Sequence, residues 1–280
     1  VTELVRTQQS LAETAAALQQ RNDEMEEELA LAREVQQALL PHEYPVVPTY
    51  STNGGRLSFG HRYIPISGLA GDFFEVVPTS PNAAGLFICD VMGHGVRSAI
   101  IVSMLRGLAE RAHESADDPG AFLSQMNTGL AAILQKAEMT MFATAFMVVA
   151  DLAKNELRYS SAGHPAAIIR GSEGASPLPM GGRGTGAALG LFPEGVYETR
   201  SMSMEGIKQL LLFTDGIIEV ENREGEAFLQ NRLVQVVSEE QCEGVEALLD
   251  RVPAGALSFA QSQRFDDDVC LLGMEVAGQG

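Results

Sequence analysis

Apolar residues follow two different spacings along this chain, and the change between them separates an N-terminal segment from the remainder. Residues 1 to about 40 contain neither glycine nor proline and are rich in Ala, Leu, Glu and Gln. This composition predicts one long helix that ends before Pro41. Beyond residue 57, short apolar runs alternate with glycine turns, polar loops and segments of helical spacing. We therefore predict a helical extension followed by one globular domain.

The N-terminal segment repeats its apolar residues every seven positions, as coiled coils do. The d positions of this repeat are Leu4, Leu11, Leu18, Met25, Ala32 and Leu39. The a positions alternate between apolar and polar residues: Val1, Gln8, Ala15, Asn22, Leu29 and Gln36. An asparagine at a favours a parallel two-stranded register, in which oppositely charged side chains, Arg21 with Glu26 and Glu28 with Arg33, meet between the helices. The pattern predicts a parallel homodimer. An amphipathic helix packed on its own domain is the alternative, which the polar a positions support.

The remainder of the chain is predicted to contain a linker followed by many strands and four helices. Prolines 45 and 48 with Gly54-Gly55 mark residues 42–56 as an extended linker. The predicted strands are 57–66, 71–77, 84–91, 142–151, 156–161, 166–170, 197–204, 208–213 and 268–276. The predicted helices are 96–112, 119–136, 228–239 and 243–260. Because strands outnumber helices and the two central helices are consecutive, we predict the α+β class, with an antiparallel β-sandwich flanked by helices.

Charge and hydropathy exclude several classes of protein. The formal net charge of −18 argues against nucleic acid or an anionic membrane as the main partner, because both are polyanions. No apolar run reaches the roughly 20 residues that a spanning helix needs, and no signal peptide begins the chain. The three cysteines, Cys89, Cys242 and Cys270, have no paired spacing, which predicts reduced thiols in a cytoplasmic protein. The start at Val1 leads us to expect a longer parent chain.

Four aspartates stand where a short apolar run meets a glycine turn or a polar loop: Asp72, Asp90, Asp215 and Asp267. A single Asp-Gly after such a run is also the commonest way to leave a strand through a turn. A carboxylate at the end of a buried strand is costly unless a cation neutralises it. Four of them in one domain therefore predict a shared site for a hard metal ion and metal-assisted chemistry on phosphate.

In their order and with their neighbours, these stretches resemble the PPM or type 2C metal-dependent serine/threonine phosphatases, in the bacterial SpoIIE/RsbU-like branch. The stretches that carry the resemblance are Gly71-Asp72-Phe73-Phe74-Glu75, Cys89-Asp90-Val91-Met92-Gly93-His94-Gly95, Phe142-Ala143-Thr144-Ala145-Phe146, Ala162-Gly163-His164-Pro165, Leu189-Gly190, Thr214-Asp215-Gly216 and Asp266-Asp267-Asp268. The resemblance covers about residues 50 to 276. Three positions depart from the usual pattern: Ala70 replaces a glycine, Glu75 an aspartate and Cys270 a threonine. All the expected metal carboxylates are present.

The resemblance implies three segments: a coiled-coil linker at 1–41, an extended linker at 42–56 and a phosphatase domain at 57–276. It implies a phosphoserine/phosphothreonine protein phosphatase that uses a metal-activated water and two divalent cations, Mn²⁺ or Mg²⁺. The implied substrate is a phosphorylated anti-sigma-factor antagonist, and the linker would join the enzyme to an upstream receiver or sensor domain. The alternatives are a non-catalytic phosphoprotein-binding module of the same fold and a phosphatase for a small molecule.

The resemblance also assigns roles at the metal site. Asp90 would bridge the two ions with help from the Val91 carbonyl, Asp72 would bind one ion, and Asp215 with Asp267 the other. The next residue, Asp268, would face away if it lay on a regular strand, so we expect it to support the ligands or to replace one. We expect Asp266 to be a solvated charge.

Several further residues near these motifs have candidate or structural roles. His94 has the chemistry of a general acid for the leaving serine oxygen, but its Gly-His-Gly turn fits a structural part equally well. We expect His164 to be a structural histidine in a turn and Glu75 to be a supporting or structural residue. Residues 181–186 are expected to form a flap or plain flexible loop, in which Arg183 has the charge to meet phosphate. Met139 and Met141 are predicted to pack in the core or the flap.

Overall fold

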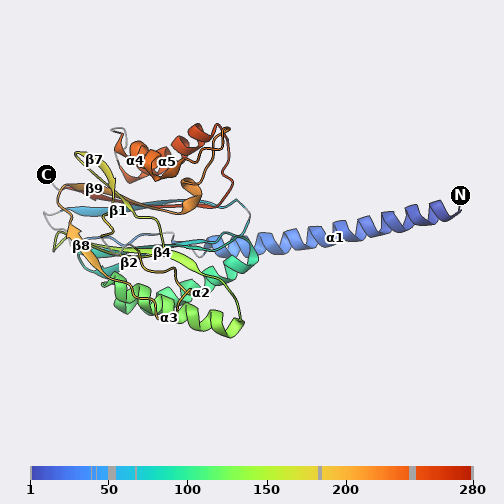
Figure 1. Cartoon of the computed structure of the whole chain (residues 1–280), viewed down its shortest axis with the longest axis horizontal. Coiled ribbons are helices and arrows are strands. Elements are labelled where there is room, and N and C mark those ends of the chain that lie inside the picture. The colour runs from blue at the N-terminus through green and yellow to red at the C-terminus, as the bar shows by residue number, and fades with distance from the viewer. Residues whose placement is uncertain are drawn as a thin grey trace. The chain divides into compact units, whose positions relative to one another are not determined.

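The computed structural model describes residues 2–38, 40–41, 43–49, 55–66, 68–181, 185–239 and 244–278 (Figure 1). The chain divides into two compact units, Val1–Leu39 and Leu40–Gly280. In the described residues, no helix has both the length and the apolar character that a membrane span requires.

The first unit is one helix, α1 (Thr2–Ala38), as its composition predicts. Glutamine and asparagine side chains donate hydrogen bonds to acidic residues one turn later, for example Gln19 Nε2 to Asp23 Oδ1 at 2.9 Å. Such pairs stabilise a helix by only a few tenths of a kcal/mol each. The d-position side chains are open to solvent: Leu11, Leu18 and Met25 are 65%, 63% and 58% exposed.

The second unit contains two five-stranded sheets in which every pair of neighbouring strands is antiparallel. One sheet has the order β1 (Arg56–Ile64), β10 (Val269–Ala277), β9 (Ile207–Phe213), β6 (Ile168–Gly171) and β7 (Gly174–Pro177). The other has the order β2 (Asp72–Ser80), β3 (Ala83–Val91), β4 (Ala143–Asp151), β5 (Glu156–Ala162) and β8 (Arg200–Ser203). This is the predicted antiparallel sandwich of the α+β class.

Two pairs of helices cover the outer faces of the sandwich (Figure 1). The helices α2 (Val96–Ala112) and α3 (Pro119–Ala137) cover the sheet that contains β2, β3 and β4. The helices α4 (Leu229–Ser238) and α5 (Val245–Ala260) cover the other sheet. The sequence sets the start of α3 clearly: Asp118 caps it by accepting hydrogen bonds from the N–H groups of Gly120 and Ala121, and Pro119 occupies the first helical position.

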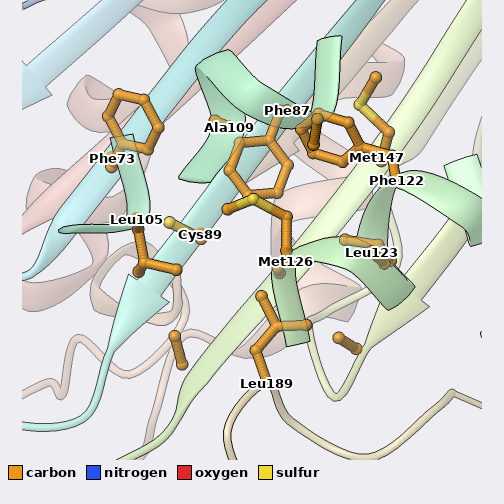
Figure 2. Packing of buried hydrophobic residues seen from close by; sticks show 14 of the residues in the cluster. Phe73, Phe87, Cys89, Leu105, Ala109, Phe122, Leu123, Met126, Met147 and Leu189 are labelled. Carbon is orange, nitrogen blue, oxygen red and sulfur yellow. The ribbon is translucent and has the colours of Figure 1, made fainter. Parts of the chain in front are cut away.

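Alternating side chains of the strands build separate cores on the two faces of each sheet. On β2, Phe73 points to the helices and Phe74 to the space between the sheets, and both are buried. Figure 2 shows the core under α2 and α3, where Phe73, Phe87 and Phe122 lie close to one another. The rings of Phe87 and Phe122 are 5.2 Å apart in an edge-to-face arrangement, a favourable geometry for aromatic pairs.

Most predicted elements are confirmed, including the helix at 96–112, but one predicted strand is shorter than expected and one strand was missed. The expected strand at 197–204 is shorter, because only Arg200–Ser203 pairs with β5. β7 was not predicted, since a segment of glycine, alanine, serine and proline lacks the residues that strands favour. Of the predicted linker, residues 42 and 50–54 lie outside the described part of the chain, and Val47 forms a bridge with Leu57.

Candidate metal centre

Three polar side chains lie next to one another at one end of the sheet that contains β2, β3 and β4. In the strand register Asp72 is opposite Asp90, and Asp90 is opposite Thr144. Directly opposite residues of antiparallel strands place their side chains on the same face. By the alternation of β2 and β3 that face is the one that carries Phe74 and Ile88 into the core between the sheets. The polar group therefore sits at the mouth of the inter-sheet core.

The other sheet supplies three more carboxylates to the same place. Asp215 begins a single turn of 3-10 helix directly after β9, and Asp267 and Asp268 directly precede β10. Because β9 and β10 are antiparallel neighbours, the end of the first strand lies beside the start of the second. A pocket of about 250 Å³ joins the two sets, lined by Gly71, Asp72, Asp90, Met92, Gly93, His94, Phe142, Thr144, Asp215, Asp267 and Asp268.

The carboxylates raise one another's proton affinity. Burial, followed by the charges of Asp215 and Asp267, raises the pKa of Asp90 to about 7. Burial and then the neighbouring Asp90 raise the pKa of Asp72, and burial and Asp267 raise that of Asp215. No lysine or arginine lines this pocket in the described part of the chain. A divalent cation would neutralise these carboxylates, and a set of carboxylate oxygens suits the hard ions Mg²⁺ and Mn²⁺.

Gly71 allows the backbone segments beneath the pocket to pack closely. A Cβ atom at this position would lie 2.9 Å from the carbonyl oxygen of Val91 and 3.0 Å from that of Gly93. The N–H of Val91 also donates to the Gly71 carbonyl at 3.1 Å. Val91 itself is buried and does not line the pocket, so the metal-binding role of its carbonyl stays a prediction.

Asp267 and Asp268 both line the pocket, although alternation along a strand would have separated them. Alternation does not apply, because β10 begins only at Val269 and both residues lie in the loop before it. Asp267 is exposed, whereas Asp268 is buried and accepts hydrogen bonds from the N–H of Ile66 at 2.7 Å and of Gly71 at 3.2 Å. Asp268 therefore connects the start of β10 to the segment that directly precedes Asp72 and β2. Asp266 is exposed and outside the pocket lining.

Thr214 is a site residue that the sequence did not reveal. Its buried hydroxyl donates a hydrogen bond to Asp72 Oδ2 at 2.9 Å and accepts one from the N–H of Cys270 at 2.9 Å. The residue thereby orients an aspartate of the opposite sheet. Its position directly before Asp215 was the only available signal, since a threonine at the end of a strand is unremarkable on its own.

Thr214→Val keeps the shape of the side chain and removes both hydrogen bonds. We expect a loss of about 1–3 kcal/mol in the free energy of unfolding, because the N–H of Cys270 and the Asp72 carboxylate lose a partner in a buried place. Urea unfolding of the metal-free protein measures the loss. Thr214→Ser, which retains the hydroxyl, should remain closer to the wild type, and equal losses in both variants would contradict the hydrogen-bond explanation.

The two candidate histidines lie in different environments. His94 is exposed, lines the pocket and stands between Gly93 and Gly95, whose φ angles of 83° and 88° favour glycine. His164 is 2% exposed and bonded on both ring nitrogens, and burial lowers its pKa to about 4. The structure thus places His94 where it can meet a substrate, whereas His164 has the hydrogen-bonded, buried position of a structural histidine.

Several other candidate residues lie away from the pocket. Glu75 points to the α2 side of its sheet, where its Oε1 lies 3.3 Å from Nε2 of His113. Met139 and Met141 pack against the core under α2 and α3. Cys89 and Cys270 are buried free thiols, whereas Cys242 lies outside the described residues. The centre of the predicted flap, residues 182–184 with Arg183, also lies outside them.

The sequence of this chain matches the model of a known protein family. Residues 80–277 match the family described as Stage II sporulation protein E (SpoIIE). The chain belongs to the SpoIIE family. Asp90, Asp215 and Asp267 lie inside the SpoIIE match, and Asp72 precedes it.

Two curated relatives and two solved structures place the chain further. It is 28% identical over 193 residues to phosphoserine phosphatase RsbP of Bacillus subtilis, covering 69% of this chain and 45% of RsbP. It is 24% identical to phosphoserine phosphatase RsbU of the same organism, covering 87% of this chain and 69% of RsbU. The chain thus spans less than half the length of RsbP.

The solved structures share the fold at low sequence identity. The SiaA-PP2C domain of Pseudomonas aeruginosa matches with a TM-score of 0.73 and 19% identity, covering 91% of this chain and 98% of that one. RsbX in complex with magnesium matches with a TM-score of 0.56 and 16% identity, covering 84% and 100%. These two structures therefore share their fold with this chain.

Proposed function

We propose that this protein is a metal-dependent phosphoserine/phosphothreonine protein phosphatase. The observation that carries the proposal is the pocket at the mouth of the sandwich. Asp72 and Asp90 from one sheet and Asp215 and Asp267 from the other line it together, with no lysine or arginine in the described lining. Two curated relatives are named phosphoserine phosphatases, which supports the same activity. A complete acidic set gives no support to a non-catalytic binding module.

The residues of the pocket fit two divalent cations, Mn²⁺ or Mg²⁺, and the RsbX structure was solved with magnesium. When bound, such ions neutralise phosphate oxygens and activate a water for attack. In our assignment Asp90 lies between the two groups of ligands, Asp72 serves one side, and Asp215 with Asp267 serves the other. Thr214 orients Asp72, and Asp268 holds the loop behind it.

His94 is the proposed general acid. It is the exposed histidine in the pocket lining, where its side chain can reach the serine or threonine oxygen that leaves. Imidazole exchanges protons near neutral pH, which suits this task. It stands between two glycines, Gly93 and Gly95, directly before α2.

The activity is tested with a phosphoserine peptide and purified full chain. We expect phosphate release with Mn²⁺ and none with an excess of chelator. p-Nitrophenyl phosphate, compared at equal concentration, separates a protein phosphatase from a small-molecule phosphatase by the ratio of kcat/KM values. If no Mn²⁺-dependent release occurs at any protein concentration, the proposal is wrong.

We further propose that the enzyme acts in the cytoplasm as the output of a signalling protein. The resemblance of residues 31–41 to the linker of the SpoIIE/RsbU-like branch supports an upstream receiver or sensor domain. The buried free thiols of Cys89 and Cys270 fit a reducing compartment. In the branch that the sequence resembles, the usual substrate is a phosphorylated anti-sigma-factor antagonist, and we propose the same class here.

We also propose that α1 makes the protein a parallel homodimer. The supporting observation is that Leu11, Leu18 and Met25, one per heptad, are all more than half exposed in the single chain. Burial of such a seam against a second helix is the usual source of coiled-coil stability.

Removal of residues 1–40 should convert a dimer into a monomer. Light scattering should give twice the 29.9 kDa chain mass for the full chain and one copy for the truncated chain. Leu18→Glu should weaken the dimer, because it places a charge in the seam, whereas Gln20→Glu adds the same charge at an outward position of the same turn and should not. A full chain that is monomeric at all concentrations removes the coiled-coil proposal.

A further inference from the structure

His164 connects the two halves of the metal centre without lining the pocket. Its Nδ1 lies 2.8 Å from Thr144 Oγ1 on β4, and its Nε2 lies 3.0 Å from the carbonyl oxygen of Phe213 at the end of β9. Thr144 lines the pocket opposite Asp90, and Phe213 is followed by Thr214 and Asp215. The imidazole is therefore a bridge between the two sheets at the level of the carboxylates.

The partners of His164 determine where its proton lies. A carbonyl oxygen can only accept a hydrogen bond, so Nε2 must carry the hydrogen. The ring is 2% exposed, its two nitrogens are bonded to the uncharged Thr144 hydroxyl and Phe213 carbonyl, and burial favours its neutral form. A neutral imidazole protonated on Nε2 has an unprotonated Nδ1, which can only accept. The Thr144 hydroxyl must then donate its single hydrogen to Nδ1.

This arrangement leaves the Thr144 oxygen with lone pairs but no hydrogen for the pocket. Without His164, the hydroxyl hydrogen could turn towards Asp90, its directly opposite neighbour, and occupy an oxygen that a cation needs. With His164, Thr144 can accept a hydrogen bond from a water but cannot donate one to a phosphate oxygen.

We propose that Thr144 is a hydrogen-bond acceptor that orients the attacking water, and that His164 is the positioning residue that keeps it an acceptor. The inference rests on the proposed phosphatase function. As an acceptor without a hydrogen to donate, the Thr144 hydroxyl can bind a water but cannot donate a hydrogen bond to the phosphoryl group. It also explains why a buried histidine, and not an aliphatic residue, joins β4 to β9.

The first test is a direct observation of the proton and does not depend on activity. Two-bond ¹H–¹⁵N correlation spectra report which nitrogen of an imidazole is protonated. For the full chain with Mg²⁺ at pH 7, with the resonance assigned from His164→Gln, we expect the neutral Nε2–H form. A protonated Nδ1, or a charged ring at this pH, would overturn the inference.

The second test is a double-mutant cycle on kcat. Thr144→Val removes the hydroxyl, and His164→Gln keeps a donor near the Nε2 position but removes the acceptor at Nδ1. We expect each variant to lower kcat for the phosphoserine peptide on the order of tenfold, with KM and the Mn²⁺ affinity from calorimetry within about twofold of the wild type. Because His164 acts through the hydroxyl, the double variant should be no slower than Thr144→Val alone.

If the fold-losses in kcat of the two single variants multiply in the double variant, so that their free energies add, His164 acts independently of Thr144. That result would overturn the inference. So would a Thr144→Val variant with wild-type kcat. Thr144→Ser, which keeps the hydroxyl, should retain most of kcat, and melting temperatures of all variants identify losses due to unfolding. A wild-type chain without Mn²⁺-dependent turnover refutes the proposed function, whereas wild-type turnover with an additive cycle refutes only this inference.

Discussion

Asp90→Asn is expected to lower Mn²⁺-dependent phosphate release from a phosphoserine peptide by about 10³-fold or more. Asp90 lies opposite Asp72 within its own sheet, and its pKa is raised by Asp215 and Asp267 of the other sheet. It is thus a carboxylate that interacts with aspartates of both sheets. Divalent ions supply several kcal/mol of transition-state stabilisation, and about 1.4 kcal/mol corresponds to a factor of ten in rate.

The matched control is Asp266→Asn, which makes the same change of charge on an exposed residue beside the site. It should keep the wild-type rate. Calorimetric titration with Mn²⁺ should show weaker binding in the Asp90 variant only. An Asp90→Asn protein with unchanged turnover would refute the assignment of Asp90 as the shared ligand, whatever the other aspartates do.

The second large effect concerns stability in the absence of metal. The pKa of Asp90 is about 7 in the folded protein against the ordinary 3.8, so between these values the folded state holds a proton that the unfolded state has released. Stability therefore falls as the pH rises from about 4 to about 7, and this group contributes no further change above that range. The raised pKa values of Asp72 and Asp215 act in the same direction.

From pH 5 to pH 8 the titration of Asp90 should lower the free energy of unfolding by about 3 kcal/mol, or roughly 5–10 °C in melting temperature for a domain of this size. Thermal unfolding with chelator between pH 5 and pH 8 measures it. At pH 8, Asp90→Asn should melt above the wild type with chelator present, because it removes a buried charge that nothing neutralises. Mn²⁺ should raise the melting temperature of the wild type and have a smaller effect on the variant. A wild type whose chelated form is most stable at pH 8 would contradict this electrostatic account.

Local signals in the sequence were sufficient for most of the fold. The Asp118-Pro119 start of α3 and the glycine turn before Val96 mark helix beginnings by backbone chemistry that any context would share. Runs such as 83–91, buried almost throughout, are recognisable because they are apolar and short. β7 was not predicted, because its sequence does not favour a strand and it is a strand through its pairing with β6.

Local sequence signals likewise identified most of the candidate site residues but not all of them. Asp72, Asp90, Asp215 and Asp267 were identifiable because each interrupts an apolar run at its end, and the structure brings all four to one pocket. The placement of Asp268 was not identifiable, because it depends on where β10 begins and on amides of Ile66 and Gly71 about 200 residues earlier in the chain.

The sequence by itself determined the fold class, the long α1 and the identity of the acidic residues, because spacing, caps and charge at strand ends act over a few residues. Only the tertiary structure decided how those residues work together. Two contacts connect the sheets: the hydrogen bond from Thr214 to Asp72, and the bridge from Thr144 through His164 to Phe213. The raised pKa of Asp90 likewise depends on Asp215 and Asp267 of the other sheet. Hydrogen bonds and charge repulsion act over a few ångströms in space, and the partners become neighbours only when the two sheets pack face to face.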